Sequence, residues 1–466
     1  MDYRQQVIKG GVYLSLRNLL SFLIGILSIL LIIRTIGPAA YGVYAAVYGI
    51  FFYLSQVGQM GINVYLIRKE GDVEDGIYHQ AFSLLLLLGT LGTMLTLPAL
   101  PWLETLVRLE GFASVGLVFA LGLPLHLIST VALARLERGL HYKHIAAVEL
   151  LTQVIYLMVA VVLAFGGAGV WAPVAGFWAG QVFTCLAYFR QAAYRPRLLW
   201  RWPLFREMTG YGLSFSAANW IWYGRNLVNP VIVARLLGAE AVGFVAVSIN
   251  LINMCSFVMN NVMRIALPTL ASVQEDKSRL ARAISEGARI QAIILGTMLV
   301  AFIVISPVAI PLIYGDKWLP VLRVLPFLAW GILVRATFGL QISALYVLRR
   351  NWQVALANFL HVVLFAGSAW LLVSSFNIQG YGLAEVVAAA SYLAVHLFTA
   401  KYVGHIDYVK TALWFCCCSA ALVAYLVSWY LVGLVFVPLL WKDCRDDLIG
   451  LVKMTRKSTS YERSSA

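Results

Sequence analysis

Charge is scarce in this chain. Only 12% of its 466 residues are Asp, Glu, Lys or Arg, which is about half the share of a typical soluble domain. In contrast, 61% of the residues are hydrophobic and the mean hydropathy is +0.82. This balance excludes an ordinary soluble domain. The apolar windows run for about 20 to 27 residues, long enough for helices that cross a bilayer and longer than barrel strands require, so composition predicts an all-α polytopic membrane protein.

Acidic residues are scarcer than basic ones. The chain has 21 Asp and Glu against 35 Lys and Arg, which gives a formal charge of +14. A nucleic-acid partner would require the basic residues to lie together on one soluble face. They are instead distributed over many short loops between apolar segments, as expected for Lys and Arg that set the topology of a membrane protein. The charge therefore indicates topology, and we predict no nucleic-acid partner.

Paired cysteines are absent. The six cysteines, Cys185, Cys255, Cys416, Cys417, Cys418 and Cys444, form no CxxC motif. Five of them lie in apolar segments, where a thiol behaves as a small hydrophobe. His141 and His144 have a spacing that suits a metal ion, but two imidazoles alone are a weak signal and a solvated loop is favoured. We therefore predict neither a disulfide nor a metal site.

Catalytic motifs are missing as well. The sequence contains no P-loop, no HExxH and no GxSxG, and no loop outside the apolar segments exceeds roughly twenty residues. A membrane glycosyltransferase, polymerase or ligase normally needs a sizeable extramembrane region to hold its acceptor and its catalytic acids. A membrane-embedded glycan enzyme is therefore disfavoured, and we predict no catalytic residue and no ATP site.

What the chain does contain is a repeat. The stretch RTIGPAAYGVYA, which starts at Arg34, returns 201 positions later as RLLGAEAVGFVA, which starts at Arg235. The matching pairs are Arg34 and Arg235, Gly37 and Gly238, Ala40 and Ala241, Gly42 and Gly243, and Ala45 and Ala246. Each copy joins two apolar segments through a glycine-containing turn, where glycine tolerates positive φ and close backbone approach. The pattern predicts one helical hairpin unit written twice.

The apolar segments divide the chain into two predicted six-helix bundles. They lie near 12–33, 41–67, 80–103, 112–134, 145–165, 170–189, 209–234, 241–267, 288–314, 320–347, 353–376 and 380–400, followed by a last block at 411–440. We assign 1–190 to the N-terminal bundle, 191–208 to a basic cytoplasmic linker, 209–401 to the C-terminal bundle and 441–466 to a basic tail. The last block is long for one span and short for two, so we expect 13 or 14 spans.

The distribution of basic residues predicts the orientation. If the N-terminus is cytoplasmic, the loops on that side up to Lys410 contain 21 Lys and Arg, against five on the opposite side. Each half then has an even number of spans, so the halves form a parallel repeat about an axis along the membrane normal, with a central cavity between them. A single span at 411–440 would place the basic tail outside, against the same rule.

Several polar residues lie inside predicted spans, although a central Arg costs roughly 2.5 to 3.5 kcal/mol there. The candidate cavity residues are Arg17, Asn18, Asn219, Trp222, Tyr223, Arg225, Asn226 and Arg335. Guanidinium groups suit phosphate oxygens, and the aromatic side chains suit sugar rings. The alternative is that each Arg snorkels or pairs with an acid, Glu149 or Glu385 in the case of Arg335. The amides, and with them Asn250, Asn253, Asn260 and Asn261, can equally join helices.

The opening KGGVYLSLRNLLSFLIGILSILLIIRTIGPAAYGVYAAVYGIFFYLSQVGQMGI resembles the start of the Wzx-type polysaccharide transporters. These are oligosaccharide-lipid flippases of the multidrug/oligosaccharidyl-lipid/polysaccharide exporter superfamily. The resemblance is most specific over residues 9–70 and is carried by Arg34, Gly37, Pro38, Tyr41, Gly42 and Tyr44. Elsewhere it rests on length, hydropathy and the two-half repeat. Members have twelve or fourteen spans, so the block at 411–440 departs from the longer pattern.

The resemblance implies translocation of an undecaprenyl-pyrophosphate-linked oligosaccharide across the bacterial inner membrane by alternating access, for the synthesis of surface polysaccharide such as lipopolysaccharide. A sugar chain cannot cross hydrocarbon unaided because each desolvated hydroxyl is costly, whereas an isoprenoid tail can stay in the lipid. Expected partners are this substrate, membrane lipid, and the polysaccharide polymerase and chain-length proteins. No cofactor is expected. Coupling to H⁺ or Na⁺ stays open, with Glu149, Glu385 and the intramembrane arginines as candidates.

The alternative within transporters is a multidrug-type small-molecule exporter of the same superfamily. Such a protein shares the two-bundle architecture but typically carries cations, and it would favour buried acids over buried arginines. The three intramembrane arginines therefore favour an anionic substrate.

Overall fold

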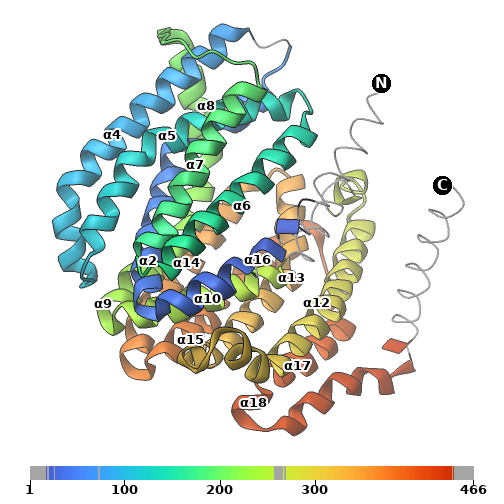
Figure 1. Ribbon diagram of the computed structural model, residues 1–466. Helices are drawn as coiled ribbons and strands as arrows, with labels where there is room; N and C mark the ends of the chain where they lie inside the picture. The colour runs from blue at the N-terminus through green and yellow to red at the C-terminus, as the bar shows by residue number, and fades with distance from the viewer. Residues whose placement is uncertain are drawn as a thin grey trace, which may run out of the picture. The chain divides into compact units, whose positions relative to one another are not determined.

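The computed structural model describes residues 17–445, except 18, 19, 22, 26, 72, 73, 257–265, 267, 268 and 443. The part of the chain that it describes consists of helices joined by short turns, with no strand (Figure 1). The predicted all-α class is therefore confirmed. The predictions made for Asn18, Asn260, Asn261 and the tail from residue 446 onward lie outside the described residues.

Contacts between Cα atoms group the chain into two compact units. Unit 1 takes its residues from Met1–Val247, Ile310–Pro320 and Val362–Tyr381, and unit 2 takes its residues from Ser248–Ala309, Val321–His361 and Gly382–Ala466. This is a division by packing, and it differs from the predicted division into sequence repeats at 1–190 and 209–401. The boundary of the two repeats stays a prediction.

Unit 1 contains most of the first half of the chain and the start of the second. Its elements are η1 (Ile29–Ile33), α2 (Arg34–Gln59), α3 (Ile62–Arg68), α4 (Asp75–Val107), α5 (Phe112–Arg138), α6 (Tyr142–Phe165), α7 (Trp171–Gln191), α8 (Trp202–Gly224), η2 (Arg225–Leu227), η3 (Val228–Val233), α9 (Ala234–Leu237), the first part of α10 (Ala239–Cys255) and the last part of α14 (Asn351–Phe376).

Helices α4, α5, α6 and α7 lie side by side as long rods (Figure 1). Small residues bring them close together. A Cβ atom on Gly89 would lie 2.6 Å from Cα of Pro124 where α4 meets α5, and one on Gly176 would lie 2.8 Å from the carbonyl oxygen of Tyr156 where α7 meets α6. Gly176 and Gly180 form a GxxxG pattern, which allows helices in lipid to approach closely.

Helix α2 is the central element of unit 1, because it contacts α4, α5, α8 and η3. Its aromatic side chains fill the space among these neighbours. The ring of Phe51 lies 5.1 Å from Phe119 on α5 and 5.9 Å from Trp178 on α7, in edge-to-face geometry that aromatic pairs favour. The turn of the first repeat motif lies inside this helix at Gly37, so the core of unit 1 holds that turn in place.

Unit 2 is built on α13. Its elements are the last part of α10, α12 (Lys277–Tyr314), η4 (Asp316–Arg323), α13 (Leu325–Val347), the first part of α14, α15 (Ile378–Ala388), α16 (Ser391–Val403), α17 (Val409–Leu422), α18 (Ala424–Val427) and η5 (Trp429–Leu440), with the ends of α12, η4 and α15 divided between the units. Helix α13 contacts α16 and α17. Cys418 of α17 is buried, and a Cβ atom on Gly296 of α12 would lie 2.8 Å from its sulfur.

The block predicted at 411–440 is divided into three helical pieces, α17, the short α18 and η5. Helix α17 ends at Leu422, the chain becomes extended at Ser428, and the 3₁₀ segment η5 then packs against α17. A chain that turns back on itself supports the hairpin interpretation over one long span. The side on which the tail lies stays a prediction.

Eight helices within the described residues are long and apolar enough to cross a membrane. They are Leu23–Gln59, Asp75–Val107, Phe112–Arg138, Tyr142–Phe165, Lys277–Tyr314, Leu325–Val347, Asn351–Phe376 and Ile378–Val403. Shorter apolar helices lie at Ala239–Cys255, Val409–Leu422 and Trp429–Leu440. The protein is therefore a multi-pass membrane protein, and these segments are compatible with the predicted 13 or 14 spans because the first of the eight bends at Gly37.

Candidate functional site

The two copies of the repeat motif have the same local structure. A π-helical segment precedes each copy, η1 up to Ile33 and η3 up to Val233. The first glycine then takes a backbone conformation that is open almost only to glycine. Gly37 has φ 78° and ψ 172°, and Gly238 has φ 81° and ψ −173°. The two copies share their residue spacing because both form the same turn.

The two turns contact each other through their second glycines. A Cβ atom on Gly42 would lie 1.8 Å from the carbonyl oxygen of Ala239, and one on Gly243 would lie 2.4 Å from that of Pro38. Pro38 and Ala239 are equivalent in the repeat, as are Gly42 and Gly243, so the two contacts are reciprocal. We call these four residues the glycine clasp. Only glycine fits at its two helical positions, because a side chain there would overlap the facing backbone.

An open groove of about 750 Å³ lies beside these turns. Its lining includes Ile36 to Ala39 from the first motif and Glu240 and Phe244 from the second, together with Asp316, Lys317, Leu319 and Pro320. Both charges are represented, and Glu240, Asp316 and Lys317 are exposed. We call this the outer groove, because the charge distribution of the sequence predicts that this end of unit 1 faces away from the cytoplasm.

Arg225 lies where the helix of the seventh predicted span changes its winding. Helix α8 ends at Gly224, η2 continues from Arg225 as a 3₁₀ turn, and η3 follows as a π-helix. Irregular winding of this kind inside a span is typical of functional sites in membrane helices. The break places Arg225 and its neighbours apart from the regular helical ladder.

Aromatic rings surround the Arg225 guanidinium. Its central carbon lies 4.8 Å from the ring centre of Trp222 and 5.8 Å from that of Phe365 on α14. Contact with ring faces stabilises a cation in apolar surroundings. Beside it, the ring of Tyr223 meets Phe52 of α2 edge-on at 5.6 Å. We call Arg225, Trp222, Tyr223, Phe52 and Phe365 the Arg225 cluster.

Arg17 belongs to a different group. Its Nε lies 3.1 Å from Oε2 of Glu149 on α6, with both side chains about a quarter to a third exposed. One turn further, Gln153 donates a hydrogen bond of 2.9 Å to Ser21. The polar face ahead of η1 therefore packs along α6. Glu149, which we had considered as a partner for Arg335, is the partner of Arg17.

The remaining candidates fall in several environments. Asn226 is exposed, and Asn219 is half-buried. Arg335 lies half-buried in α13 of unit 2. Asn229, which is buried, donates to the carbonyl oxygen of Val242 at 3.3 Å and so joins η3 to α10. The predicted cavity set stays a prediction, since its members belong partly to unit 1 and partly to unit 2.

The repeated arginines differ from each other. Arg235 donates a hydrogen bond of 3.0 Å to the carbonyl oxygen of Leu106, at the end of α4. Its role there is to satisfy a helix C-terminus, where the last carbonyls lack partners within the helix. Arg34, in contrast, is exposed. The sequence repeat alone gave no sign of this difference.

A polar network at the predicted cytoplasmic end was missed by sequence reasoning. Arg138 donates from Nη1 to the carbonyl oxygens of Leu66, Ile67 and Lys69, at 3.1, 3.1 and 2.7 Å, and so caps α3. The linker is tied to α4, because the backbone N–H of Arg201 donates to Oε1 of Gln80 at 2.6 Å. The linker, predicted to be cytoplasmic, is thus docked against α4 rather than a free loop.

Within this network, Lys69 and Tyr65 both donate to Oε1 of Glu207, at 2.5 and 2.8 Å. The hydrogen bond from Lys69 lowers the pKa of the Glu207 carboxyl below its ordinary value, and the hydroxyl of Tyr65 adds to this effect. The same contact raises the pKa of Lys69. The pair joins the end of α3 to the start of α8.

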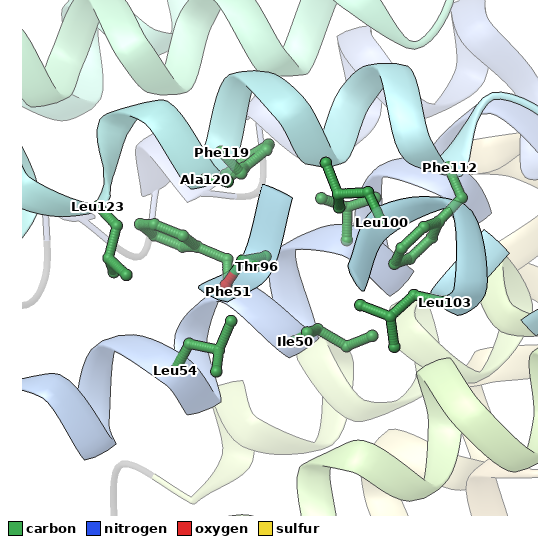
Figure 2. A pocket seen from close by; sticks show the side chains of 12 residues that line it. Ile50, Phe51, Leu54, Thr96, Leu100, Leu103, Phe112, Phe119, Ala120 and Leu123 are labelled. Carbon is green, nitrogen blue, oxygen red and sulfur yellow. The ribbon is translucent and has the colours of Figure 1, made fainter. Parts of the chain in front are cut away.

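A second cavity in unit 1 is too small for a substrate. It has a volume of about 20 Å³ and is enclosed by Phe51 and Leu54 of α2 and by residues of α4 and α5 (Figure 2). Its lining is apolar apart from Thr96, whose hydroxyl donates to the carbonyl oxygen of Gly92. A void of this size and lining is a packing defect between helices.

These features define a class: a multi-pass helical membrane protein whose chain carries a repeated hairpin motif and whose spans contain half-buried arginines. The particular family follows from comparison. Residues 31–323 match the family described as polysaccharide biosynthesis protein, and the chain belongs to this family. The match includes both copies of the repeat motif and the Arg225 cluster apart from Phe365.

Similar proteins take part in polysaccharide synthesis. Over 300 residues the chain is 20% identical to the succinoglycan biosynthesis transport protein ExoT of Rhizobium meliloti (strain 1021), which covers 64% of this chain and 60% of that protein. Over 236 residues it is 24% identical to the amylovoran biosynthesis protein AmsL of Erwinia amylovora, covering 49% and 60%. The match thus spans about 60% of the length of these two relatives.

The fold is shared with two kinds of transporter. The lipid II flippase MurJ in an inward closed conformation has a TM-score of 0.70 at 11% identity, covering 97% of this chain and 100% of that one. An inward-facing multidrug resistance transporter of the MATE family, in the MOP superfamily, has a TM-score of 0.67 at 14% identity, covering 84% and 98%. The predicted resemblance to polysaccharide transporters agrees with the family match, and the fold is shared with a transporter of the MOP superfamily. Both structural neighbours are transporters rather than enzymes.

Proposed function

We propose that this protein is a flippase that moves a lipid-linked oligosaccharide, carried on undecaprenyl pyrophosphate, across the bacterial inner membrane for surface polysaccharide synthesis. Membership of the polysaccharide biosynthesis family supports this proposal. The relatives are matched over only part of their length. That the whole chain has the function of a polysaccharide transporter is therefore part of the proposal.

The observation that carries the proposal is the Arg225 cluster. The Arg225 guanidinium lies in a span near the rings of Trp222 and Phe365. It stays positively charged there, because arginine does not lose its proton at physiological pH. Its planar fork suits two oxygens of a pyrophosphate, and the neighbouring Tyr223 and Trp222 offer faces for sugar rings. A lipid-linked oligosaccharide presents both kinds of group side by side, because its pyrophosphate is bonded to the first sugar.

Substitution of Arg225 tests this assignment. Arg225→Ala and Arg225→Met should abolish transfer of the lipid-linked oligosaccharide between leaflets in proteoliposomes, and Met keeps the length of the apolar stem that packs on the rings. Arg225→Lys should restore transfer only in part, because an ammonium lacks the bidentate fork. Arg195→Ala, a change of an exposed linker arginine, serves as the control. Full transfer by Arg225→Met at equal protein level would refute the role of this guanidinium.

A multidrug-type exporter is the second candidate, and the fold similarity to a MATE transporter favours keeping it. The two functions differ in the charge of the cargo. Transport of cationic dyes by the purified protein, with no movement of lipid-linked oligosaccharide, would support the exporter. The reverse result would support the flippase.

Energy coupling and protein partners also belong to the proposal. We infer that transport is coupled to an H⁺ or Na⁺ gradient and that the exported unit passes to a polysaccharide polymerase and chain-length proteins. A flippase must deliver its product on the outer side, where the outer groove with its exposed charges offers a polar surface.

A further inference from the structure

Unit 2 contains a buried pair of titratable side chains that the Arg225 cluster does not use. His361 on α14 and Glu385 on α15 have side chains that are 3% and 8% exposed, and Nε2 of His361 lies 3.9 Å from Oε1 of Glu385. His361 is about 15 Å along α14 from its first residue, at 1.5 Å per residue. The pair thus lies well inside two helices that can span the membrane.

The packing around the pair fixes both side chains. Nδ1 of His361 is 3.0 Å from the hydroxyl of Ser391 on α16. Glu385 lies against the backbone of α13 at Gly331, where an added Cβ atom would lie 2.8 Å from its Cγ and 3.2 Å from Oε1. Glycine at 331 therefore makes room for the carboxylate. Four helices thus meet at the pair: α14 and α15 carry its two side chains, and α13 and α16 pack against them.

The surrounding ionisable groups come from the same helices. On α13, Arg335 is one turn after Gly331 and so shares the face against which Glu385 packs. On α16, the ring of Tyr392 meets His361 at 5.9 Å, and its phenol is neutral at physiological pH. Arg335 and Tyr392 are therefore ionisable side chains on the faces of α13 and α16 that pack against the pair.

We propose that His361 and Glu385 together form a proton-binding site that couples the transport cycle to a proton gradient, an inference that rests on the proposed flippase function. One H⁺ from water binds either Nε2 of His361 or the carboxylate of Glu385, and the charge of the pair changes from −1 to 0. Release of the same proton to water restores −1. With Arg335 included, the group changes from 0 to +1.

A proton fits this site better than a metal ion. Na⁺ and other hard cations prefer several oxygen ligands, whereas one side of this pair is an imidazole nitrogen, and Nδ1 of the same ring is engaged by Ser391. His361 and Glu385 provide one nitrogen and one carboxylate at ion-pair distance, 3.9 Å. Histidine changes its charge near neutral pH, which suits a carrier that binds and releases protons.

The contact of Glu385 with Gly331 links proton binding to the packing of α15 against α13. While α15 lies against α13, the carboxylate is buried, and burial raises the cost of its charge. A movement that separates α15 from α13 would hydrate Glu385 and favour the deprotonated form. Proton release and helix separation are thus linked by a single equilibrium, and protonation on the other side favours the packed arrangement.

Counting protons tests the site without transport. Proton binding by the purified protein between pH 5 and 8 should fall by one per chain in His361→Gln, by one in Glu385→Gln, and by only one in the double variant, because both residues share the same proton. The matched control is His144→Gln, at an exposed position in the first turn of α6. Combined with Glu385→Gln, it should lose two. Ser391→Ala should keep the count and shift the midpoint, and it extends the test if a Gln variant does not fold. Losses that add in the His361 and Glu385 double variant would overturn the shared site.

Transport then tests coupling. In proteoliposomes with a fluorescent undecaprenyl-pyrophosphate oligosaccharide, a gradient of one pH unit should change wild-type transfer by up to about tenfold for one proton per substrate. The ratio with and without the gradient should approach one in His361→Gln and Glu385→Gln and stay at the wild-type value in His144→Gln. An equal gradient response in all variants would overturn the coupling and leave the flippase proposal intact. Absence of transfer by the wild type in every condition would instead refute the flippase proposal, whatever the proton count.

Discussion

The glycine clasp gives the sharpest quantitative prediction. Gly42→Ala places a Cβ atom 1.8 Å from the carbonyl oxygen of Ala239, and Gly243→Ala places one 2.4 Å from that of Pro38. Because real Cβ contacts are not found below 3.0 Å, the two backbones must separate by about 1.2 Å in the first case and about 0.6 Å in the second, and overpacking of this kind costs about 1 to 3 kcal/mol. Gly42→Ala should therefore be the more destabilising change.

The assay is the apparent unfolding midpoint of the purified protein in detergent. Gly42→Ala should lower it by several degrees and Gly243→Ala by less, whereas Gly367→Ala, where an added Cβ atom meets nothing within 4 Å, should leave it unchanged or raise it slightly. The double variant should lose less than the sum of the single losses, because one separation of the backbones relieves both contacts. A midpoint for Gly42→Ala equal to that of Gly367→Ala would refute the geometry of the clasp.

Three further predictions concern unit 1 and the topology. Arg138→Ala should lower the unfolding midpoint by the equivalent of about 1 to 3 kcal/mol, because the carbonyls at the end of α3 lose their donor, with Arg138→Lys recovering a part; an unchanged midpoint would show that water replaces the guanidinium. Glu207→Gln should lower the midpoint slightly at neutral pH, because a depressed carboxyl pKa stabilises the fold only above that pKa. This difference should vanish as the pH falls through the lowered pKa of Glu207, and it should shrink at high salt because the pair with Lys69 is partly exposed. A difference that persists in acid would contradict the ionic role. A reporter fused at Pro203 should be cytoplasmic, as the charge bias predicts, and one fused after Met454 should be cytoplasmic if 411–440 is a hairpin, whereas an outside location would indicate a single crossing.

Much of the helical architecture could be predicted from the sequence because hydropathy reports directly on membrane helices. The predicted segment at 112–134 lies within α5, that at 353–376 within α14, and the repeat gave the positions of both glycine turns. The observed helices agree with the apolar segments of the sequence because every backbone N–H and C=O group in lipid must form its hydrogen bond within its own helix. The uncertain block at 411–440 was also the place where the fold is irregular.

The contacts that shape the site could not be predicted, because they join residues far apart in the chain. Phe365 reaches Arg225 from 140 positions away, and Glu149 reaches Arg17 across 132. Gln80 and the linker at Arg201 meet through a backbone N–H, which leaves no trace in residue type. For the His361 and Glu385 pair, the sequence identified Glu385 as titratable but gave no reason to connect it with a histidine on the preceding helix.

The two π-helical segments determine how the helix before each motif is rotated about its axis relative to that motif. A π turn closes its hydrogen bonds from residue i to i+5, so it holds one residue more than an α turn. Since each residue turns an α-helix by about 100°, the extra residue rotates everything upstream relative to the motif that follows. Deleting one residue from Ile29–Ile33 or from Val228–Val233 should convert that segment to ordinary α-helix and leave Arg34 or Arg235 in place. A regular span such as α6 has no π turn that could absorb a change of one residue. The chain therefore has, ahead of each motif, a segment whose length can change by one residue while the glycine turn keeps its conformation.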